Sequence, residues 1–433
     1  MKDYKDTLNL PGTSFPMKAN LPNREPEILK FWDEIDLYKK IRDKSAGKKS
    51  FLLLDGPPYA NGKIHIGHAL NKILKDFIIK SKTLFGFDAP YLPGWDCHGL
   101  PIEHQVEKKK GKVGPKLTAK EFRDHCRAYA LRQVEEQKED FIRLGIPGEW
   151  GNPYLTMDQR YEAEQIRAFA KIYKNNHVMH GHKPVHWCLD CQSALAEAEV
   201  EYIDKTSTSV DVLFSVVNIS DFIGRTKSKK IDNEVELYIP IWTTTPWTLP
   251  SNEAVAMGKD INYAIFKAKL NERDIFVIIA DDLQESIASR WGVKKLDKLE
   301  EISAENLSGL QLQHPFDQRT VPVLLGDHVT TENGTGSVHT APAHGQEDFY
   351  LGKENNLDLN CYVNTYGVFA EAKESFANQH IFKSESHILE KLDHSSLLIS
   401  SENFEHSYPH CWRHKTPLIF RTTRQWFISM ENE

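Results

Sequence analysis

The sequence predicts an α/β domain near the N-terminus and a mostly β domain inserted in its second half. Two observations support this fold class. An apolar stretch, Phe51–Leu54, leads through a Gly/Pro-rich turn into a helical pattern, and further helical patterns occupy about 118–144 and 158–176. From about residue 205, short runs rich in Val and Ile alternate with turn residues instead. A chain of 433 residues is also too long for a single core, so several domains are expected.

The first 46 residues are expected to form an N-terminal arm. Residues that interrupt regular structure recur along it: Pro11, Gly12, Pro16, Pro22 and Pro26. A short helix is predicted to follow over residues 27–40.

Residues 47–204 are predicted to form the first part of the α/β domain, together with a connective segment. The apolar stretch 51–54 is expected to be a strand. In the helix that follows the turn, apolar residues are spaced four, three, one, three and one positions apart. This spacing puts them on one helical face: Ile66, Leu70, Ile73, Leu74, Phe77 and Ile78.

Residues 205–395 are predicted to form the inserted β-rich domain. Its strands are expected at Val210–Val217, Val235–Ile241, Tyr263–Lys267, Ile275–Ile279 and Val321–Leu324. Residues 396–433 are expected to return to the first domain, with a strand over 421–430.

Composition places the chain among soluble globular proteins, with 40% apolar and 27% charged residues. It has no apolar run of membrane length and no signal-peptide pattern, so no membrane partner is expected. Six cysteines in 433 residues form no disulfide framework, which favours a reducing cytoplasm. The net charge of −7 argues by itself against nucleic-acid binding. However, phosphate contacts need only local basic patches, and 108–120 and 225–230 are two candidates, although such runs are commonly solvated surface.

The most informative string is Pro58-Tyr59-Ala60-Asn61-Gly62-Lys63-Ile64-His65-Ile66-Gly67-His68. A strand, a turn and a helix N-terminus in this order form an anion site, because free N–H groups and the positive end of the helix dipole face the ligand. His65 and His68 are three residues apart and share one face of the first helical turn. Their imidazoles can bind phosphates and stabilise charge that develops at an attacked phosphorus. Gly67 between them leaves room for the ligand. The alternative is a capped helix with two surface histidines.

This string resembles the HIGH signature of class I aminoacyl-tRNA synthetases. The resemblance implies a Rossmann-like catalytic domain that uses ATP and Mg²⁺, with residues 58–68 binding ATP and His65 and His68 stabilising the α-phosphate. No lysine-containing second signature (KMSKS-like) occurs in the sequence. The chain is therefore expected to be an N-terminal fragment of a longer enzyme.

A second string, Gly94-Trp95-Asp96-Cys97-His98-Gly99-Leu100-Pro101-Ile102-Glu103, resembles the second conserved loop of the isoleucyl branch of this family. The valyl and leucyl branches differ here. The resemblance implies that Asp96 pairs with the ammonium group of the amino acid, which needs a carboxylate partner when it leaves water. It also implies that Pro57 lines the side-chain pocket. The plainer interpretation makes Asp96 a turn residue.

The β-rich domain contains a second constellation. Residues 241–252 put five hydroxyl groups near one strand end, and the loop 334–348 carries two imidazoles and two carboxylates. Hydroxyls can bind a ribose and position water, and a carboxylate can hold an ammonium group. Either segment alone is usually structural. Together they resemble the editing site of the isoleucyl, valyl and leucyl synthetases.

By that resemblance, a set of polar residues contacts the aminoacyl-adenosine end: Thr243, Thr244, Thr245 and Asn252. Asp348 anchors the amino group and His339 lies beside the ester. Trp242 and Trp247 are expected to pack rather than to react. Such a second pocket is needed because one methylene group distinguishes isoleucine from valine too weakly, the limit for which this enzyme family is the standard illustration.

A third pattern pairs Cys188-Leu189-Asp190-Cys191 with Cys411-Trp412-Arg413-His414. A CxxC and a CxxH knuckle fit a tetrahedral Zn²⁺ site with the ligands Cys188, Cys191, Cys411 and His414, provided that the fold brings them together. His406 and His410 are competing ligands. The alternative is a metal-free remnant held by packing. With four protein ligands, zinc would be structural rather than catalytic.

Taken together, the resemblance implies an isoleucine–tRNA ligase that also edits mischarged Val-tRNA. Its partners would be isoleucine tRNA, isoleucine and ATP, and it would act as a monomer. The anticodon-binding domain would lie outside this chain. The alternatives are a valyl or leucyl sister enzyme, an isolated tRNA-binding and deacylating module, or a nucleotidyltransferase that shares only the HxGH motif.

Overall fold

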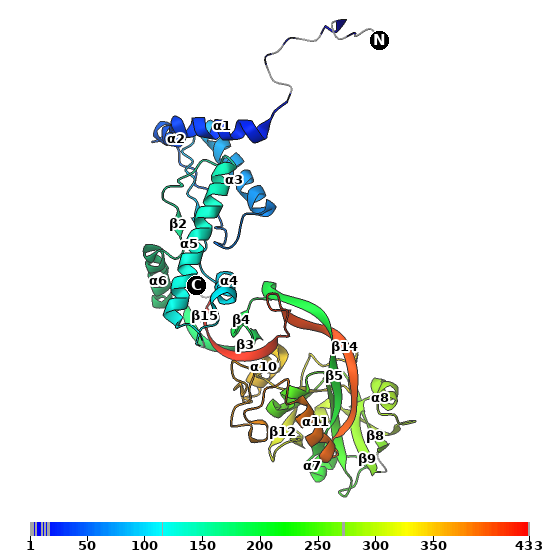
Figure 1. Ribbon diagram of the computed structural model, residues 1–433. Helices are drawn as coiled ribbons and strands as arrows, with labels where there is room; N and C mark the ends of the chain where they lie inside the picture. Colours follow the sequence, from blue (N-terminus) through cyan, green and yellow to red (C-terminus); the bar gives the residue numbers. More distant parts are fainter. Residues whose placement is uncertain are drawn as a thin grey trace. The chain divides into compact units, whose positions relative to one another are not determined.

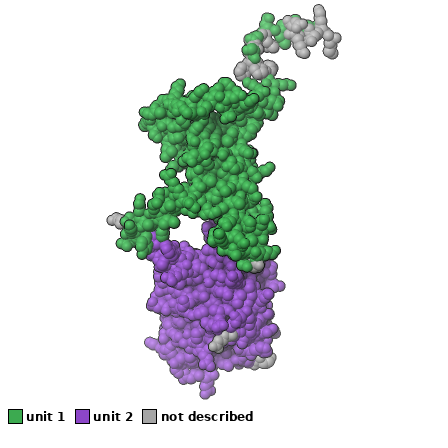
Figure 2. All heavy atoms as spheres, turned by 60° about the vertical axis from the view of Figure 1, so that its left-hand side comes forward, with its two compact units in different colours: residues 1–177 green, residues 178–433 purple. Residues whose placement is uncertain are grey.

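The computed structural model describes residues 4, 7–9, 12, 14, 18–114, 116–270 and 273–431, with the side chain of Glu374 left out. The chain divides into two compact units, residues 1–177 and 178–433 (Figure 2). No helix in the described ranges is long and apolar enough to cross a membrane. Each unit is described separately below.

The first unit is mainly helical, with short parallel strand pairings. Its elements are α1 (Leu21–Glu34), α2 (Leu37–Ser45), α3 (Ile66–Leu84), β1 (Gly94–Trp95), α4 (Leu100–Lys110), α5 (Ala119–Arg143), β2 (Tyr154–Leu155) and α6 (Gln159–Lys174). The helices expected near 118–144 and 158–176 are confirmed as α5 and α6. Strand β1 pairs in parallel with β2, as expected for an α/β unit.

The N-terminal arm differs from the expectation. Instead of one helix over 27–40, α1 and α2 meet at Asp36, whose φ of 49° breaks the helical path. Pro22 and Pro26 lie inside α1 rather than interrupting it. Pro22 is at the helix start, where its missing N–H needs no partner. Pro11 and Pro16 lie outside the described residues.

The expected strand over 51–54 is wrong. The backbone there is extended but joins no ladder, and pairs only at its edge, where Ser50 bridges Asp88 in parallel. A strand needs neighbours for its backbone groups, and the described residues supply only this one bridge.

Helix α3 forms where predicted, but its apolar face is exposed. Leu70 and Leu74 are 59% and 52% exposed, and Ile66, Phe77 and Ile78 are exposed as well. The buried side of α3 consists instead of Ile79, which is 4% exposed, with Lys72 and Asp76. Of the six residues of the predicted apolar face, Ile73 alone is half-buried.

The core of the first unit surrounds Trp95 and Phe141, both fully buried. Trp150 stacks on Phe141 with ring centroids 6.2 Å apart. The indole N–H of Trp95 donates to Oε1 of Gln137 on α5 at 2.9 Å. The core therefore connects β1 directly to α5.

The second unit is rich in β-structure, as predicted. Its strands are β3 (Val178–Cys188), β4 (Ser193–Leu195), β5 (Val200–Val216), β6 (Leu237–Thr243), β7 (Ala254–Met257), β8 (Asn262–Leu270), β9 (Arg273–Ala280), β10 (Asp297–Ser303), β11 (Gln311–Gln313), β12 (Thr320–Leu325), β13 (Ser337–Thr340), β14 (Leu398–Cys411) and β15 (Ile419–Ile428). Its α-helices are α7 (Ile219–Thr226), α8 (Gln284–Arg290), α9 (Ala304–Leu307), α10 (Gln346–Glu354) and α11 (Glu385–His394). Its 3₁₀ segments are η2 (Glu197–Glu199), η3 (Pro246–Ser251), η4 (Asp281–Leu283) and η5 (Glu374–Phe376).

Most of these strands form one mixed sheet. Within the described ranges its order is β10-β8-β9-β6-β5-β11-β12-β7-β13, and β14 also pairs with β5. The five predicted strand runs overlap β5, β6, β8, β9 and β12. The buried faces of these strands form the large apolar core of the unit, which positions the strand ends that carry polar residues.

Two long antiparallel strand pairs, β5 with β14 and β3 with β15, are further features of this unit. Strands β5 and β14 run side by side (Figure 1), from the pair Val212–Leu398 to the pair Val200–Cys411. Strand β15 overlaps the strand predicted over 421–430 and pairs with β3 along its whole length, ending at Val178–Ile428.

Candidate functional site

The N-terminus of α3 is capped by a histidine side chain. His65 is the N-cap residue, and its Nδ1 accepts the N–H groups of Gly67 at 3.1 Å and His68 at 3.4 Å. Two N–H groups that the sequence suggested as free anion donors are therefore already bound. Because Nδ1 is the acceptor, the proton of neutral His65 is on Nε2, which is a hydrogen-bond donor.

His68 stacks on His65, with ring centroids 3.9 Å apart and an interplanar angle of 19°. Burial lowers the pKa of His68, and the neighbouring His65 and Lys72 lower it further. Its Nδ1 is buried without a hydrogen-bond partner in the described chain. The pair thus presents imidazole nitrogens with unused hydrogen-bonding capacity at a helix N-terminus, which suits recognition of a phosphate oxygen.

One face of α5 holds the signature loop, which we define as residues 56–68. Oε1 of Gln133 accepts the N–H of Gly62 at 2.6 Å, and Tyr129 donates to Oδ1 of Asn61 at 2.8 Å. Gln137 is fully buried and donates to the carbonyls of Tyr59 at 3.0 Å and Gly62 at 2.8 Å.

These three residues of α5 were not predicted to contact the signature loop. Tyr129, Gln133 and Gln137 are four residues apart, which places them on one face of a helix. Polar residues at this spacing on a face that is otherwise apolar were the available signal.

A buried ion cluster fixes the base of the signature loop and was also missed. Asp55 accepts hydrogen bonds from Lys72 and Lys75 of α3, and from the hydroxyl of Tyr91 at 2.7 Å. Burial acts to raise the pKa of Asp55, but the hydrogen bonds from the two lysines and Tyr91 outweigh it, and the pKa is lowered. The charged cluster ties the chain before the turn to the second turn of α3.

Asp96 lies beside the signature loop. The N–H of Ala60 donates to the carbonyl of Asp96 at 2.8 Å, and the N–H of Asp96 donates to the carbonyl of Pro58 at 2.9 Å. Oδ1 of Asp96 accepts the N–H of His98 at 3.2 Å, as a turn residue would. Oδ2 has no donor among the described residues. Pro57 is half-buried one residue before this pairing. The structure therefore brings Asp96 to the loop with one oxygen available.

The second unit brings together part of its predicted constellation at the end of β6. We call Thr243, Thr244, Thr245 and Thr248 the hydroxyl cluster. The hydroxyls of Thr243 and Thr245 are 3.2 Å apart, and Thr248 donates to the carbonyl of Thr245 at 2.8 Å. Thr244 is half-buried.

His339 on β13 is fixed by this cluster. Its Nε2 is 2.9 Å from the hydroxyl of Thr248, which already donates to Thr245, so Nε2 carries the proton and Thr248 accepts it. The amide of Asn252 lies 3.4 Å from Nδ1. Both nitrogens are thus engaged, and His339 is a positioning group. Thr248 was not predicted as the partner of His339.

His339 stays neutral. It is completely buried, and burial followed by the nearby His344 and His314 lowers its pKa to about 3. Asn252 is fully buried, and its Oδ1 has no donor in the described chain. An unpaired buried acceptor costs free energy, so this oxygen suits a hydroxyl or amino group of a ligand.

Asp348 lies in the first turn of α10, next to the residue that follows β13. Its Oδ2 accepts the N–H of Ala341 at 2.9 Å. Burial raises its pKa to about 6, although the bond from Ala341 and the nearby His328 act to lower it. No cation pairs with this carboxyl group in the described residues. A bound ammonium would supply the missing counter-charge.

The aromatic residues near this site pack, as expected. Trp247 makes an edge contact with His344, with ring centroids 4.9 Å apart. Trp242 does the same with Phe404 at 5.1 Å. Nδ1 of His344 lies 3.0 Å from the carbonyl of Phe420, so His344 anchors the loop to β15.

The cysteine and histidine knuckles converge. The ligand atoms of Cys188, Cys191, Cys411 and His414 all lie within 4.8 Å of one another. The two sulfurs of Cys191 and Cys411 are 3.8 Å apart, and Sγ of Cys191 is 3.2 Å from Nδ1 of His414. Tetrahedral ligands at zinc–sulfur distances would be about 3.8 Å apart, so the donor set fits.

The competing histidines lie elsewhere. Nε2 of His406 contacts the hydroxyl of Ser207 at 3.0 Å, and Nδ1 of His410 contacts the carbonyl of Tyr408 at 2.8 Å. Hydrogen bonds from Cys191 lower the pKa of Cys188, which favours a thiolate there.

The chain is similar to proteins of known class. A family model described as tRNA synthetases class I (I, L, M and V) matches residues 27–432. An isoleucine–tRNA ligase of Vibrio atlanticus (strain LGP32) is 56% identical over 434 residues, which cover 100% of this chain and 46% of that protein. One of Francisella philomiragia subsp. philomiragia is 53% identical over 433 residues, with the same coverage. The chain spans about half the length of these relatives, and it belongs to the class I tRNA synthetases of the I, L, M and V group.

Proposed function

We propose that the chain is the part of an isoleucine–tRNA ligase that carries the ATP signature and the editing unit. The whole enzyme would join isoleucine to ATP, giving isoleucyl-adenylate and pyrophosphate, and then transfer isoleucine to isoleucine tRNA. The observation that carries the proposal is the pairing of Ala60 with Asp96, which sets a free carboxylate oxygen beside the histidine signature. The relatives, isoleucine–tRNA ligases at 53–56% identity, support the amino acid.

At the synthetic site, residues 58–68 would bind ATP. Nε2 of His65 would donate to a phosphate oxygen, and His68 would stabilise charge that develops at the α-phosphate. Mg²⁺ would neutralise part of the triphosphate charge. Oδ2 of Asp96 would accept the ammonium group of isoleucine, and Pro57 would face its side chain.

At the editing site, misattached valine would be hydrolysed. Asp348 would bind its ammonium group, and the hydroxyl cluster with Asn252 would contact the terminal ribose. His339, kept neutral by burial and held in place by Thr248, would form the wall beside the ester. Water attack would then depend on positioning by hydroxyls rather than on proton abstraction by His339.

The cysteine–histidine cluster would hold Zn²⁺ through Cys188, Cys191, Cys411 and His414. Four protein ligands leave no open position, so the metal would only join the strands that carry them. We further propose that the enzyme acts as a monomer in the cytoplasm.

The test uses the complete protein. His68→Ala and His65→Asn should reduce isoleucine-dependent pyrophosphate exchange by roughly two to three orders of magnitude, as expected when one charge-stabilising group is lost. Asparagine is itself a good helix cap, so His65→Asn should keep the helix. Asp348→Ala should instead leave exchange intact and let Val-tRNA accumulate. Wild-type exchange in both histidine variants would contradict the synthetic assignment.

A second candidate is an isolated deacylating module, which the convergence of Thr248, Asn252 and His339 within the second unit supports. The purified chain would then hydrolyse Val-tRNA but show no exchange. The same exchange assay, run on residues 1–433, separates the two.

A further inference from the structure

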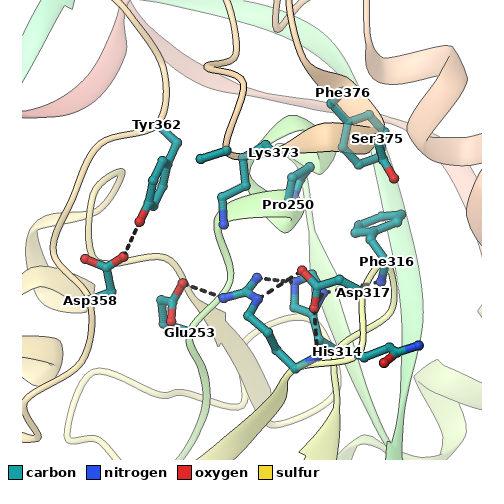
Figure 3. A pocket seen from close by; sticks show the side chains of 13 residues that line it. Pro250, Glu253, His314, Phe316, Asp317, Asp358, Tyr362, Lys373, Ser375 and Phe376 are labelled. Carbon is teal, nitrogen blue, oxygen red and sulfur yellow. Dashed lines mark hydrogen bonds and ion pairs between the residues drawn. The ribbon is translucent and has the colours of Figure 1, made fainter.

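A cavity of about 550 Å³ opens in the second unit, and two of its lining residues, Pro250 and Glu253, flank the segment that contains Asn252. Three segments line it: the end of η3 and the residues that follow, the turn between β11 and β12, and part of residues 358–376. Neither the hydroxyl cluster nor His339 or Asp348 is among the described lining residues. Figure 3 shows side chains from all three segments pointing into one space.

One wall of this cavity is apolar. Phe316 and Phe376 meet edge to face, with ring centroids 5.2 Å apart, and Pro250 lies next to them. Such a wall suits a branched aliphatic or aromatic group, which gains free energy when it leaves water.

The cavity also contains an ammonium group whose hydrogen bonds are unused. Lys373 points into the cavity, and its Nζ lies 4.6 Å from the centre of the Tyr362 ring (Figure 3). It has no hydrogen-bond acceptor or ion-pair partner among the described residues. Burial, and then the nearby Arg319, lower its pKa. A carboxylate at Nζ would satisfy donors that the protein leaves open.

Arg319 does not have the same freedom. It donates to Glu253 at 2.7 Å and to Asp317 at 2.9 Å. Its charge is therefore already neutralised within the wall, and Lys373 is the cation left for a ligand.

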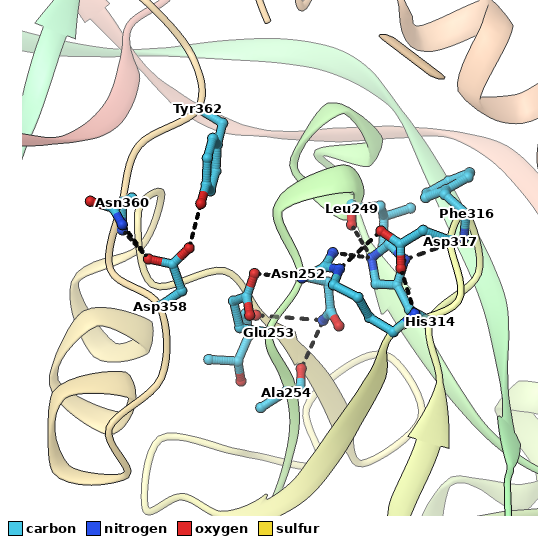
Figure 4. A network of polar contacts seen from close by, with 12 residues as sticks. Leu249, Asn252, Glu253, Ala254, His314, Phe316, Asp317, Asp358, Asn360 and Tyr362 are labelled. Atoms are coloured by element: carbon cyan, nitrogen blue, oxygen red, sulfur yellow. Dashed lines mark hydrogen bonds and ion pairs between the residues drawn. The ribbon is translucent and has the colours of Figure 1, made fainter. Parts of the chain in front are cut away.

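The cavity also offers one unused carboxylate oxygen. Oε1 of Glu253 takes the hydrogen bond from Arg319, whereas Oε2 has no donor in the described chain. Both oxygens of Asp358 already accept hydrogen bonds, one from Tyr362 at 2.6 Å and the other from two N–H groups of Asn360, as Figure 4 shows. Burial raises the pKa of Glu253, although its ion pair with Arg319 acts to lower it.

The charges of the lining residues also favour a ligand that carries both a positive and a negative group. Three acidic side chains and two basic ones line the cavity: Glu253, Asp317 and Asp358 against Arg319 and Lys373. A simple anion would add to the negative excess, and a simple cation would leave Lys373 unsatisfied. A ligand that bears both charges matches both groups.

We propose that this cavity binds a free α-amino acid with an apolar side chain, with its carboxylate on Lys373, its ammonium on Glu253 and its side chain against Phe316 and Phe376. The site is separate from the proposed editing site, and its ligand is bound without being transformed.

The test is saturation-transfer NMR on the 433-residue chain with L-leucine as the probe. The leucine methyl protons should receive the strongest transfer, because they would lie against the two phenylalanine rings. Lys373→Met should weaken binding about tenfold or more, since a charge-assisted hydrogen bond is lost. Glu253→Gln, which keeps the size of the side chain, should also weaken it. Lys353→Met is the matched control, because Lys353 is exposed and outside the cavity, and it should bind as the wild type does.

Two further arms locate the ligand and define its class. Asp348→Ala should leave leucine binding unchanged. If that variant abolishes binding while Lys373→Met does not, leucine occupies the editing site and the proposal is wrong.

3-Methylbutylamine and 4-methylpentanoate each lack one of the charged groups and should bind more weakly than leucine. Equal binding of either one, or no transfer to leucine at 10 mM (roughly the weak end of useful affinity), would overturn the zwitterion assignment. Circular dichroism confirms that each variant is folded.

Discussion

The ionised carboxyl group of Asp348 lowers the stability of the folded chain, because it is buried without a cation partner among the described residues. Its pKa is raised to about 6 by burial, so the folded state binds the proton more tightly than the unfolded state does. As pH rises from about 4 to about 6, the unfolded state loses its proton first, and stability falls. A residue kept charged without a counter-ion is understandable if a ligand supplies the cation.

Asp348→Asn should therefore stabilise the ligand-free chain at neutral pH. The amide keeps an acceptor for the N–H of Ala341 but cannot ionise. We expect a gain on the order of 2–3 kcal/mol at pH 8, a rise of several degrees in Tm, that shrinks toward zero at pH 4. Thermal melts over this pH range measure it.

Glu347→Gln is the matched control, because Glu347 is the exposed neighbour in the same helical turn. It should shift Tm by less than about a degree. A constant gain of Asp348→Asn at every pH would show that ionisation of Asp348 is not the cause.

At the scale of the element, α5 acts as a template for the signature loop. Gln137 alone satisfies two loop carbonyls and the indole of Trp95. Gln137→Ala should cost about 2–3 kcal/mol, since the buried indole N–H of Trp95 and two part-buried loop carbonyls lose their partner. Urea unfolding measures the loss. Gln165→Ala is an equivalent truncation at an exposed position of α6 and should change stability by less than about 0.5 kcal/mol. Similar costs for both variants would contradict the template.

The faces of α3 provide a second test. Ile79→Ala should cost about 2–5 kcal/mol, because Ile79 is buried. Leu70→Ala, on the predicted apolar face, should change stability by less than about 0.5 kcal/mol, because that side chain is already exposed. If Leu70→Ala destabilises the chain as much as Ile79→Ala, the predicted face is packed in solution after all.

At the scale of the whole molecule, the cysteine–histidine cluster joins the end of β3 to the end of β14. We expect about one zinc per purified chain, measured by elemental analysis, and a lower Tm after chelation. Cys188→Ser should lose the metal, because three protein ligands remain. Cys126→Ser, outside the cluster, should retain it. A metal-free preparation that is insensitive to chelators would favour a packed remnant.

The features that were predictable from the sequence are those encoded by short, contiguous motifs. The histidine signature, the hydroxyl-rich segment and the two knuckles each lie within about a dozen residues, and the strand runs of the second unit were readable from period and composition. Contacts between distant segments were not. Gln137 meets Gly62 across 75 residues, and Glu253 meets Arg319 across 66. Nothing local in the sequence specifies such pairs.

The α3 face shows a different limit. Its spacing correctly predicted a helix, but spacing shows which residues share a side and not whether anything lies against that side. Likewise, the stretch 51–54 has strand composition, but a strand exists only where neighbours complete its hydrogen bonds.

The pairing of β3 with β15 has a consequence for how the second unit could be handled as a part. Its first strand residue, Val178, is the register partner of Ile428. Paired residues in an antiparallel ladder lie only about 5 Å apart. The two ends of this segment of some 250 residues are therefore close neighbours. A two-residue turn can span such a gap. The unit could therefore be inserted into a surface turn of another protein, because its two ends lie about as far apart as the two ends of such a turn.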